Sequence, residues 1–436
     1  MGSYVPGSKE EQQQMLEFLG ILNIEELFND IPESVKLKGA LDIPSGKSEL
    51  EVLRTMKAIS GKNKIFDVVF RGAGAYNHYI PSVVKTIAAK ERFLTAYTPY
   101  QPEISQGVLQ VIFEYQSMIC ELTGLDTSNA SVYDGASAAA EGVAMCCDAR
   151  KNKVVISGAA KSDTIETIKT YCKAAGRNLI IVPAKDGVTD AAALKENIEG
   201  GACLYAEMPN YYGIIEDYES LGNIVHEAGG KFIMGVNPIT LGIYKSPAEF
   251  GADIAVGEAQ PLGMPMSFGG PYLGYMACKS ELTRKLPGRV VGQSVDHEGR
   301  KAYVLTLQAR EQHIRRDKAS SNICSNQALC ALTAVAYVGA MGSIGMENVA
   351  AQCYSKAHYA AEEIGKIKGF ELEFNNEFFN EFITKCPIDS RKLMEKLEES
   401  NILGGLPVDG GILWCVTEMN TKEDIDRLCA VLREVA

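Results

Sequence analysis

A run of positively charged side chains followed by small polar ones could bind an anion. In the stretch LQAREQHIRRDKASSNICSN, four cations precede two serines and an asparagine, in a chain of formal net charge −12. Guanidinium groups and hydroxyls recognise phosphates and carboxylates. Such a charge run is usually a solvated helix face, but the hydroxyls directly after the cations favour anion binding. The residues are Arg310, Arg315, Arg316, Lys318, Ser320, Ser321 and Asn322.

Two loops carry an unusual set of aromatic and polar side chains. They read RGAGAYNHYIP and FLTAYTPYQPEISQG, without helical or strand periodicity. Loops placed by a rigid scaffold often carry function, whereas aromatics that fill a seam between domains are the structural alternative. The histidine is either an acid–base group or a positioning residue. The residues are Tyr76, Asn77, His78, Tyr79, Tyr97, Tyr100, Gln101 and Glu103.

A third candidate is the small-residue stretch SVYDGASAAAEGVAMCC. A glycine and Ser137 open a helix that begins near residue 136. Free N–H groups and the positive end of the helix dipole make such a turn an anion site. Tight packing of a helix of small residues explains the pattern equally well, so both interpretations stay open.

The elements that must position these groups alternate between helix and strand. Apolar strands are expected at 153–157, 178–182, 202–208, 231–236 and 253–257, and the helices between them end at glycines. Apolar strands separated by helices of about 15 residues predict a mostly parallel sheet covered on both faces. The fold class is therefore α/β, with three layers.

The residues at two strand ends indicate whether this chain could hold one particular cofactor. Open α/β sheets bind ligands at the carboxyl ends of their strands, and in pyridoxal phosphate (PLP) enzymes an aspartate there pairs with the pyridinium nitrogen. Here Asn237 occupies that place. A Ser-x-x-Lys would follow the next strand, but its positions are Glu258 to Pro261. Proline has no amine, so the lysine that would hold the cofactor covalently is missing.

The rest of the chain predicts two further parts. Residues 8–60 read as helices interrupted by loops, and the pattern from about Met346 predicts two helices on a few strands, including FELEF, NEFITKC and ILWCV. We therefore expect a helical N-terminal extension (1–60), a large α/β domain (61–330) and a small α+β C-terminal domain (331–436).

Composition narrows the function classes. A net charge of −12 disfavours a nucleic-acid surface. We expect no signal peptide and no membrane-spanning run. The twelve cysteines form no C-x-x-C pair and lie in apolar segments, so buried reduced thiols in a cytoplasmic protein are the better interpretation. The five histidines are too dispersed to suggest a metal site.

The quoted motifs carry a resemblance to a known family. The segments YVPGSKEEQQQMLEFLG, AYNHYIP, TAYTPYQPEISQG, GEAQPLGMPMSFGGPYLG and QAREQHIRRDKASSNICSNQAL resemble the N-terminal half of the glycine cleavage system P-protein family, over essentially the whole chain. The resemblance implies the fold of type I PLP enzymes. It also implies a reaction in which glycine is decarboxylated and its aminomethyl group passes to the lipoyl arm of the H-protein.

The resemblance implies that, in the two-subunit form of this family, PLP and its Schiff-base lysine belong to subunit 2. The missing lysine is then expected. The implied partners are subunit 2, the lipoylated H-protein and glycine, assembled as a dimer of heterodimers in the cytoplasm. Type I active sites lie at the dimer interface, so we expect this chain to lend loops to its partner. The implied catalytic residues are His78, Tyr97, Tyr100 and Glu103, and the implied cofactor-binding residues are Ser320, Ser321, Asn322 and Arg316.

Two rival hypotheses stay open. One is a self-sufficient homodimeric PLP lyase, such as an aldolase or desulfurase, with a lysine elsewhere such as Lys279. The other is a non-catalytic scaffold that docks the lipoyl carrier protein or stabilises a partner. The absence of both expected anchor residues disfavours the first, and the polar aromatic loops weigh against the second.

Overall fold

The computed structural model describes residues 7–436. They form two compact units, which divide between Ile65 and Phe66. The start of the predicted 1–60 extension, with the letters YVP of the first motif, lies outside the described residues. The boundary between 61–330 and 331–436 stays a prediction, since both segments share the second unit.

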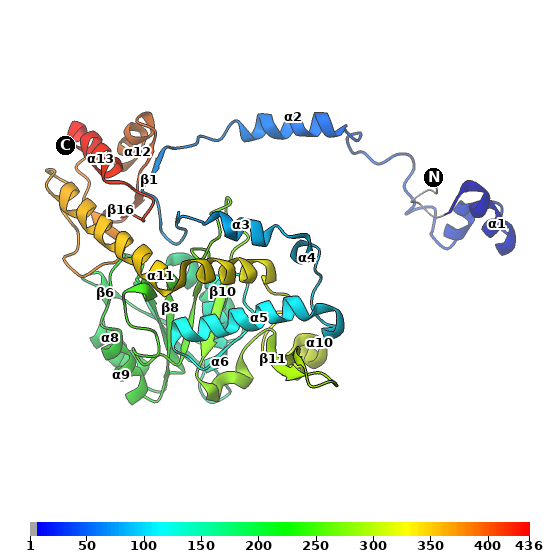
Figure 1. Ribbon diagram of the computed structural model, residues 1–436, viewed down its shortest axis with the longest axis horizontal. Helices are drawn as coiled ribbons and strands as arrows, with labels where there is room; N and C mark the ends of the chain where they lie inside the picture. Colours follow the sequence, from blue (N-terminus) through cyan, green and yellow to red (C-terminus); the bar gives the residue numbers. More distant parts are fainter. Residues whose placement is uncertain (1–6) are drawn as a thin grey trace. The chain divides into compact units, whose positions relative to one another are not determined.

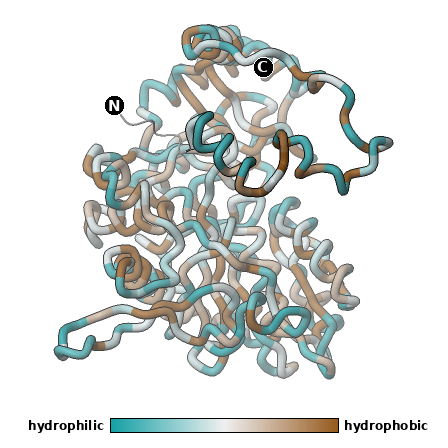
Figure 2. Tube along the Cα trace, turned by 90° about the vertical axis from the view of Figure 1, so that its right-hand side faces the viewer, coloured by the Kyte–Doolittle hydropathy of each residue, from teal (hydrophilic) through white to brown (hydrophobic). Residues whose placement is uncertain are grey.

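The N-terminal unit is helical without a core of its own. It contains α1 (Lys9–Leu19), the 3₁₀ helix η1 (Ile24–Phe28) and α2 (Glu49–Ser60), and Ser8 and Ser48 start the two α-helices with capping boxes. Hydrophobic and hydrophilic positions alternate along its trace (Figure 2), yet none of its described residues is buried. The side chain of Phe18 is 91% exposed.

The second unit is built on a seven-stranded sheet in the order β2-β10-β9-β8-β7-β3-β4. The strands of this sheet are β2 (Thr127–Ser128), β3 (Lys153–Ser157), β4 (Asn178–Val182), β7 (Cys203–Met208), β8 (Lys231–Val236), β9 (Ile254–Glu258) and β10 (Gly274–Cys278). The five strands from β9 to β4 are parallel, and β10 is antiparallel to both neighbours. The predicted α/β fold with a mostly parallel sheet is confirmed.

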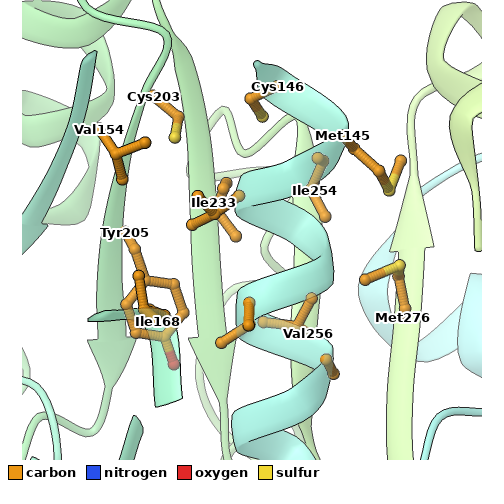
Figure 3. Packing of buried hydrophobic residues seen from close by; sticks show 14 of the residues in the cluster. Met145, Cys146, Val154, Ile168, Cys203, Tyr205, Ile233, Ile254, Val256 and Met276 are labelled. Atoms are coloured by element: carbon orange, nitrogen blue, oxygen red, sulfur yellow. The ribbon is translucent and has the colours of Figure 1, made fainter. Parts of the chain in front are cut away.

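Helices cover both faces of this sheet (Figure 1), as the predicted three layers require. On one face, α6 (Gly135–Cys146) and α7 (Ser162–Ala174) pack on alternate strand residues such as Val154 and Ile233 (Figure 3). The intervening strand residues, such as Val155 and Phe232, face α8 (Ala191–Ile198) and α9 (Tyr218–Glu227). Further along that second face lie α5 (Pro102–Thr123) and α11 (Ala328–Gly365).

The C-terminal part contains a small sheet, β13 (Glu381–Thr384), β16 (Gly411–Cys415) and β15 (Leu406–Val408), with α12 (Ser390–Glu399) and α13 (Lys422–Val435). Of the expected strands, NEFITKC and ILWCV are present, but FELEF is not a strand and only Leu372 bridges to Thr384. The short elements are β1 (Val68–Val69) with β14 (Ile402–Leu403), β5 (Ala184–Lys185) with β6 (Val188–Thr189), α3 (Ser82–Ala88), α4 (Glu91–Leu94) and α10 (Gln312–Arg315). A hairpin of β11 (Val290–Val295) and β12 (Lys301–Thr306) completes the unit.

Helix α11 is one continuous element through Met346, near which the sequence pattern changes. It runs from Ala328 and contains one non-helical residue, Gly342, with a φ of 61°. The helix is long and apolar enough to cross a membrane by length and composition alone. Its side chains Ala334, Tyr337 and Ala350 belong to the buried core against the sheet, so we interpret it as a core helix.

Candidate active site

A cavity of about 330 Å³ lies where the parallel strands β7, β8 and β9 end. We call it the edge cavity. The carboxyl ends of parallel strands leave such a hollow because the following chain turns away to either face. It is lined by residues 72–76, 134–136, 161, 163, 164, 205, 207–209, 235–237, 257, 258 and 272. Asn237, predicted at this edge, is among them, and its Oδ1 accepts a hydrogen bond from the N–H of Ile239.

The predicted anion turn at the start of α6 is present, but two carboxylates of the chain occupy it. The Oδ1 of Asp134 accepts from the N–H of Ser137 at 2.7 Å, and the Oε2 of Glu258 accepts from the N–H of Gly135 at 3.1 Å. Glu258 also accepts from the N–H groups of Gln260 and Leu273. Burial raises the pKa of Glu258, and these backbone hydrogen bonds act in the opposite direction. Two of the N–H groups of this helix N-terminus, which would attract a phosphate, therefore already have an acceptor.

PLP does not fit the edge cavity. Pro261 supplies no amine, and a phosphate at α6 would have to displace Glu258 from three hydrogen bonds. The four carboxylates in the lining, Asp134, Asp163, Glu207 and Glu258, face a single lysine. Such a surround repels a phosphate dianion.

Lys279, the lysine of the rival homodimeric hypothesis, lies at the wrong edge of the sheet. It follows β10, whose last residue Cys278 pairs with Ile254 at the beginning of β9. Its Nζ binds the Oδ1 of Asp253 at 2.8 Å. The lysine is thus held at the amino ends of the parallel strands, opposite the edge cavity.

The loop at 76–79 connects the large sheet to the C-terminal part. Tyr76 exchanges two backbone–side chain hydrogen bonds with Gln260, and its Oη donates to the Oε2 of Glu381 at 2.7 Å. His78 is buried, and its Nδ1 lies 2.8 Å from the Oε2 of Glu418. Two of the four predicted loop residues are therefore fixed inside this chain, which favours a positioning role for His78.

The His78 region also bears on metal binding. Ligand atoms of His78, Cys353 and Glu418 all lie within 4.8 Å of one another. They are joined by direct contacts, since the Sγ of Cys353 donates to Glu418 at 3.3 Å. That the chain holds no metal stays a prediction.

The loop at 97–103 is more accessible. The side chains of Tyr97 and Tyr100 are 84% and 45% exposed, and Glu103 is exposed in the first turn of α5. Both tyrosines line a cavity of about 800 Å³ with Gln101 and Ser105. Tyr97 and Glu103 are thus accessible to a partner or a ligand, and the Tyr100 ring is partly so.

A buried arginine joins this loop to the 319–327 segment. Arg289 is only 1% exposed, and its Nη2 donates to the Oη of Tyr100 at 2.7 Å. Its Nη1 donates to the Oδ1 of Asn326 at 3.2 Å, and its Nε has no partner among the described residues. The Oη of Tyr100 also lies 3.9 Å from the Sγ of Cys324. We call Tyr100, Arg289, Cys324 and Asn326 the Tyr100 cluster.

The predicted anion-binding residues lie close to this cluster in the sequence, but the structure gives most of them no ligand-like arrangement. Ser320, Asn322 and Arg316 are exposed. The Oγ of Ser321 accepts from the N–H of Ile323, and Ser321 also bonds Glu141. Their role in cofactor binding stays a prediction.

Glu141 is a buried carboxyl group, 3% exposed, in the middle of α6. Burial raises its pKa to about 7, although the hydrogen bond from Ser321 and the charge of Arg177 act against this. The pKa of Glu141 is therefore higher in the folded state than in the unfolded state. At low pH the protonated side chain stabilises the fold, and this stabilisation is lost as the pH rises through about 7.

Replacing Glu141 with glutamine should therefore stabilise the protein at alkaline pH. We expect a gain of about 1–3 kcal/mol in the free energy of unfolding at pH 8, and little gain at pH 5. Urea unfolding at both pH values measures this. Glu196→Gln, at an exposed position on α8, is the control. An equal effect of Glu141→Gln at both pH values would contradict a titrating carboxyl at this position.

Several residues of these sites were not predicted from the sequence. Arg289, Glu381 and Glu418 contact the predicted loops from positions 189 or more residues away, apart from any motif. A weak signal existed for Arg289, since an arginine beside the apolar pair Val290 and Val291 indicates a buried charge. For Glu381 and Glu418 we find no such signal.

Comparisons with known proteins agree with this geometry. The family described as "Glycine cleavage system P-protein" matches residues 2–432. A "Probable glycine dehydrogenase (decarboxylating) subunit 1" of Desulfitobacterium hafniense is 48% identical, over 99% of this chain and 100% of that protein. The protein of the same name from Moorella thermoacetica is 47% identical, over 99% of each chain.

Solved structures add the fold. The structure titled "Crystal structure of glycine decarboxylase (P-protein) of the glycine cleavage system, in inhibitor-bound form" has a TM-score of 0.93 and 39% identity, and all of each chain is covered. A cysteine desulfurase from Thermococcus onnurineus has a TM-score of 0.63 at 14% identity, covering 90% of this chain and 99% of that one. The second likeness shows the fold alone.

Proposed function

Since this chain belongs to the glycine cleavage system P-protein family, as subunit 1 of a glycine dehydrogenase (decarboxylating), we propose that it is the half of the active unit that does not hold the cofactor covalently. PLP is the cofactor that the family and the fold support. In this proposal a second subunit carries PLP and its lysine, and this chain completes the shared site.

The edge cavity is the observation that carries the proposal. Pro261 stands where the lysine would be, and Glu258 and Asp134 accept hydrogen bonds from two backbone N–H groups of the α6 turn. These features support a chain that holds no PLP of its own in the edge cavity. An enzyme of this family must then obtain the cofactor from another chain.

The remaining partners follow from the same proposal. The H-protein with its lipoyl arm and glycine are the substrates, and two heterodimers associate in the cytoplasm. The exposed apolar side chains of the N-terminal unit, such as Phe18, Leu22 and Leu53, support a partner surface. The accessible loop with Tyr97, Tyr100 and Glu103 is our candidate for reaching the partner's site, with Ser320, Ser321, Asn322 and Arg316 beside it and His78 positioning the neighbouring loop.

Reconstitution with subunit 2 tests this proposal. We expect exchange of labelled bicarbonate into glycine only when both chains and PLP are present, because neither chain alone holds a complete site. Borohydride reduction followed by peptide mapping should then find the pyridoxyl group on a lysine of subunit 2.

The same experiment separates the rivals. A pyridoxyl-lysine in this chain, at Lys161 or Lys279 for example, would revive the self-sufficient enzyme. Exchange by subunit 2 alone at the full rate would leave this chain the role of a scaffold.

A further inference from the structure

The edge cavity lies where a sheet of this kind binds ligands. Its lining residues differ in chemistry from those of a cofactor pocket of this fold. Its volume of about 330 Å³ is at the lower end of the range of small-molecule sites. The cavity is far larger than a single water needs. Size and position therefore suit a small metabolite.

One wall of this cavity is acidic. Glu207 is 4% exposed, and its two carboxylate oxygens accept from the Oη of Tyr205 at 2.9 Å and from the N–H of Lys161 at 2.9 Å. Asp134 caps α6 through Oδ1 alone. No ion pair joins either carboxylate to a cation within residues 7–436. The buried carboxylate of Glu207 and the half-buried carboxylate of Asp134, both without a cation, attract an ammonium group.

Two unsatisfied donors also line the cavity. Asn237 is 8% exposed, and its Nδ2 has no hydrogen-bond partner among the described residues. The half-buried Lys161 packs its aliphatic carbons beside Gly74. Its positive charge acts to lower the pKa of Glu381. The ammonium group forms no hydrogen bond or ion pair in the part of the chain that the structure describes. A carboxylate would satisfy both donors.

We propose that the edge cavity binds a small zwitterionic amino acid, with its ammonium group at Glu207 and Asp134 and its carboxylate at Lys161 and Asn237. The cavity thus has an acidic wall and two donors, which fits a zwitterion better than a phosphate or a simple cation. The site lies within this chain alone. It does not depend on the proposed shared site, and it requires no PLP.

Calorimetric titration of the full chain without PLP tests this inference. Glycine, acetate and methylammonium are the three probes, since the last two each carry one of glycine's charged groups. We expect glycine to bind saturably with one site per chain, and the single-charge probes to bind at least about tenfold more weakly, because each loses one charged hydrogen-bonding end. Lys161→Met should weaken glycine binding by about tenfold or more.

Asn237→Asp is the second variant, because it keeps the Oδ1 that accepts from Ile239 but replaces the free donor with a negative charge. It should weaken glycine binding at least as much. Lys169→Met, on the exposed side of α7, is the matched control and should leave binding unchanged. Absence of saturable glycine binding would overturn the inference, as would binding that neither variant weakens. Exchange activity with subunit 2 is measured separately, so failure here leaves the proposed function standing.

Discussion

Replacing Arg289 with methionine is expected to lower the rate of glycine–bicarbonate exchange by the reconstituted pair about 100-fold. A displacement of about 1 Å in a positioned group can lower a reaction rate by this factor. The fully buried guanidinium holds both the Oη of Tyr100 and the Oδ1 of Asn326. It also lies over the Tyr100 ring at 4.8 Å. Methionine fills a similar volume but offers no donor, so the loop and the 319–327 segment lose their common anchor.

The measurement must separate positioning from loss of fold. We expect the melting temperature and the association with subunit 2 to change little, because an unpaired buried charge is itself costly and its removal offsets the lost contacts. The loss should appear in kcat more than in KM. Arg300→Met, in the exposed tip of the same hairpin, is the control. Full exchange activity in the Arg289 variant would contradict a role for the Tyr100 cluster in the shared site.

The central sheet could be predicted because its signals are local. The strands at 153–157, 178–182 and 231–236 have the predicted bounds, and β7 and β9 differ by one residue. Buried parallel strands are continuous apolar runs, and glycines end the helices between them. Since strand ends share one edge, Asn237 and Glu258 could be placed together before any coordinates.

The contacts that fix the loops could not be predicted, because they join distant parts of the chain. His78 and Glu418 are 340 positions apart, and Tyr76 and Glu381 are 305 apart. A single sequence shows neither pair. The accessible Tyr97 and the buried His78 also have the same kind of loop sequence, so only the fold distinguishes a side chain available to a partner from one held internally.

The N-terminal unit shows a second limit of prediction from the sequence. The expected helices in residues 8–60 include α1 and α2, and in the structure a capping box at Ser8 and another at Ser48 start them. What covers their apolar faces does not follow from local signals, since periodicity shows that a face is apolar and leaves its partner open. Assembly is therefore the property that the sequence pattern predicts least.

Replacing Glu418 with alanine is expected to lower the free energy of unfolding by about 2–5 kcal/mol, since each buried donor left without its acceptor costs about 1–3 kcal/mol. Its carboxylate accepts from the N–H of Tyr79 at 2.7 Å and contacts the Nδ1 of His78 at 2.8 Å. Cys353 donates to the same oxygen as His78. Alanine leaves the buried His78 and Cys353, and the N–H of Tyr79, without their acceptor. Urea unfolding at pH 7 measures the loss, and Glu395→Ala, at an exposed position on α12, is the control.

The pH dependence of this loss identifies its cause. Burial alone would raise the pKa of Glu418, but the hydrogen bond and charge of His78 and the N–H of Tyr79 bring it below its ordinary value of 4.5. A depressed carboxyl pKa stabilises the fold above the unfolded pKa, and this stabilisation disappears as the pH falls through the folded value. The difference between the natural chain and Glu418→Ala should therefore be constant above about pH 5 and shrink below it. Glu418→Gln keeps an acceptor for Tyr79 but cannot ionise, so it should lose less stability and show no such acid limb. If both variants lost the same amount at every pH, packing of the side chain, and not its charge, would hold the 76–79 loop against the C-terminal part.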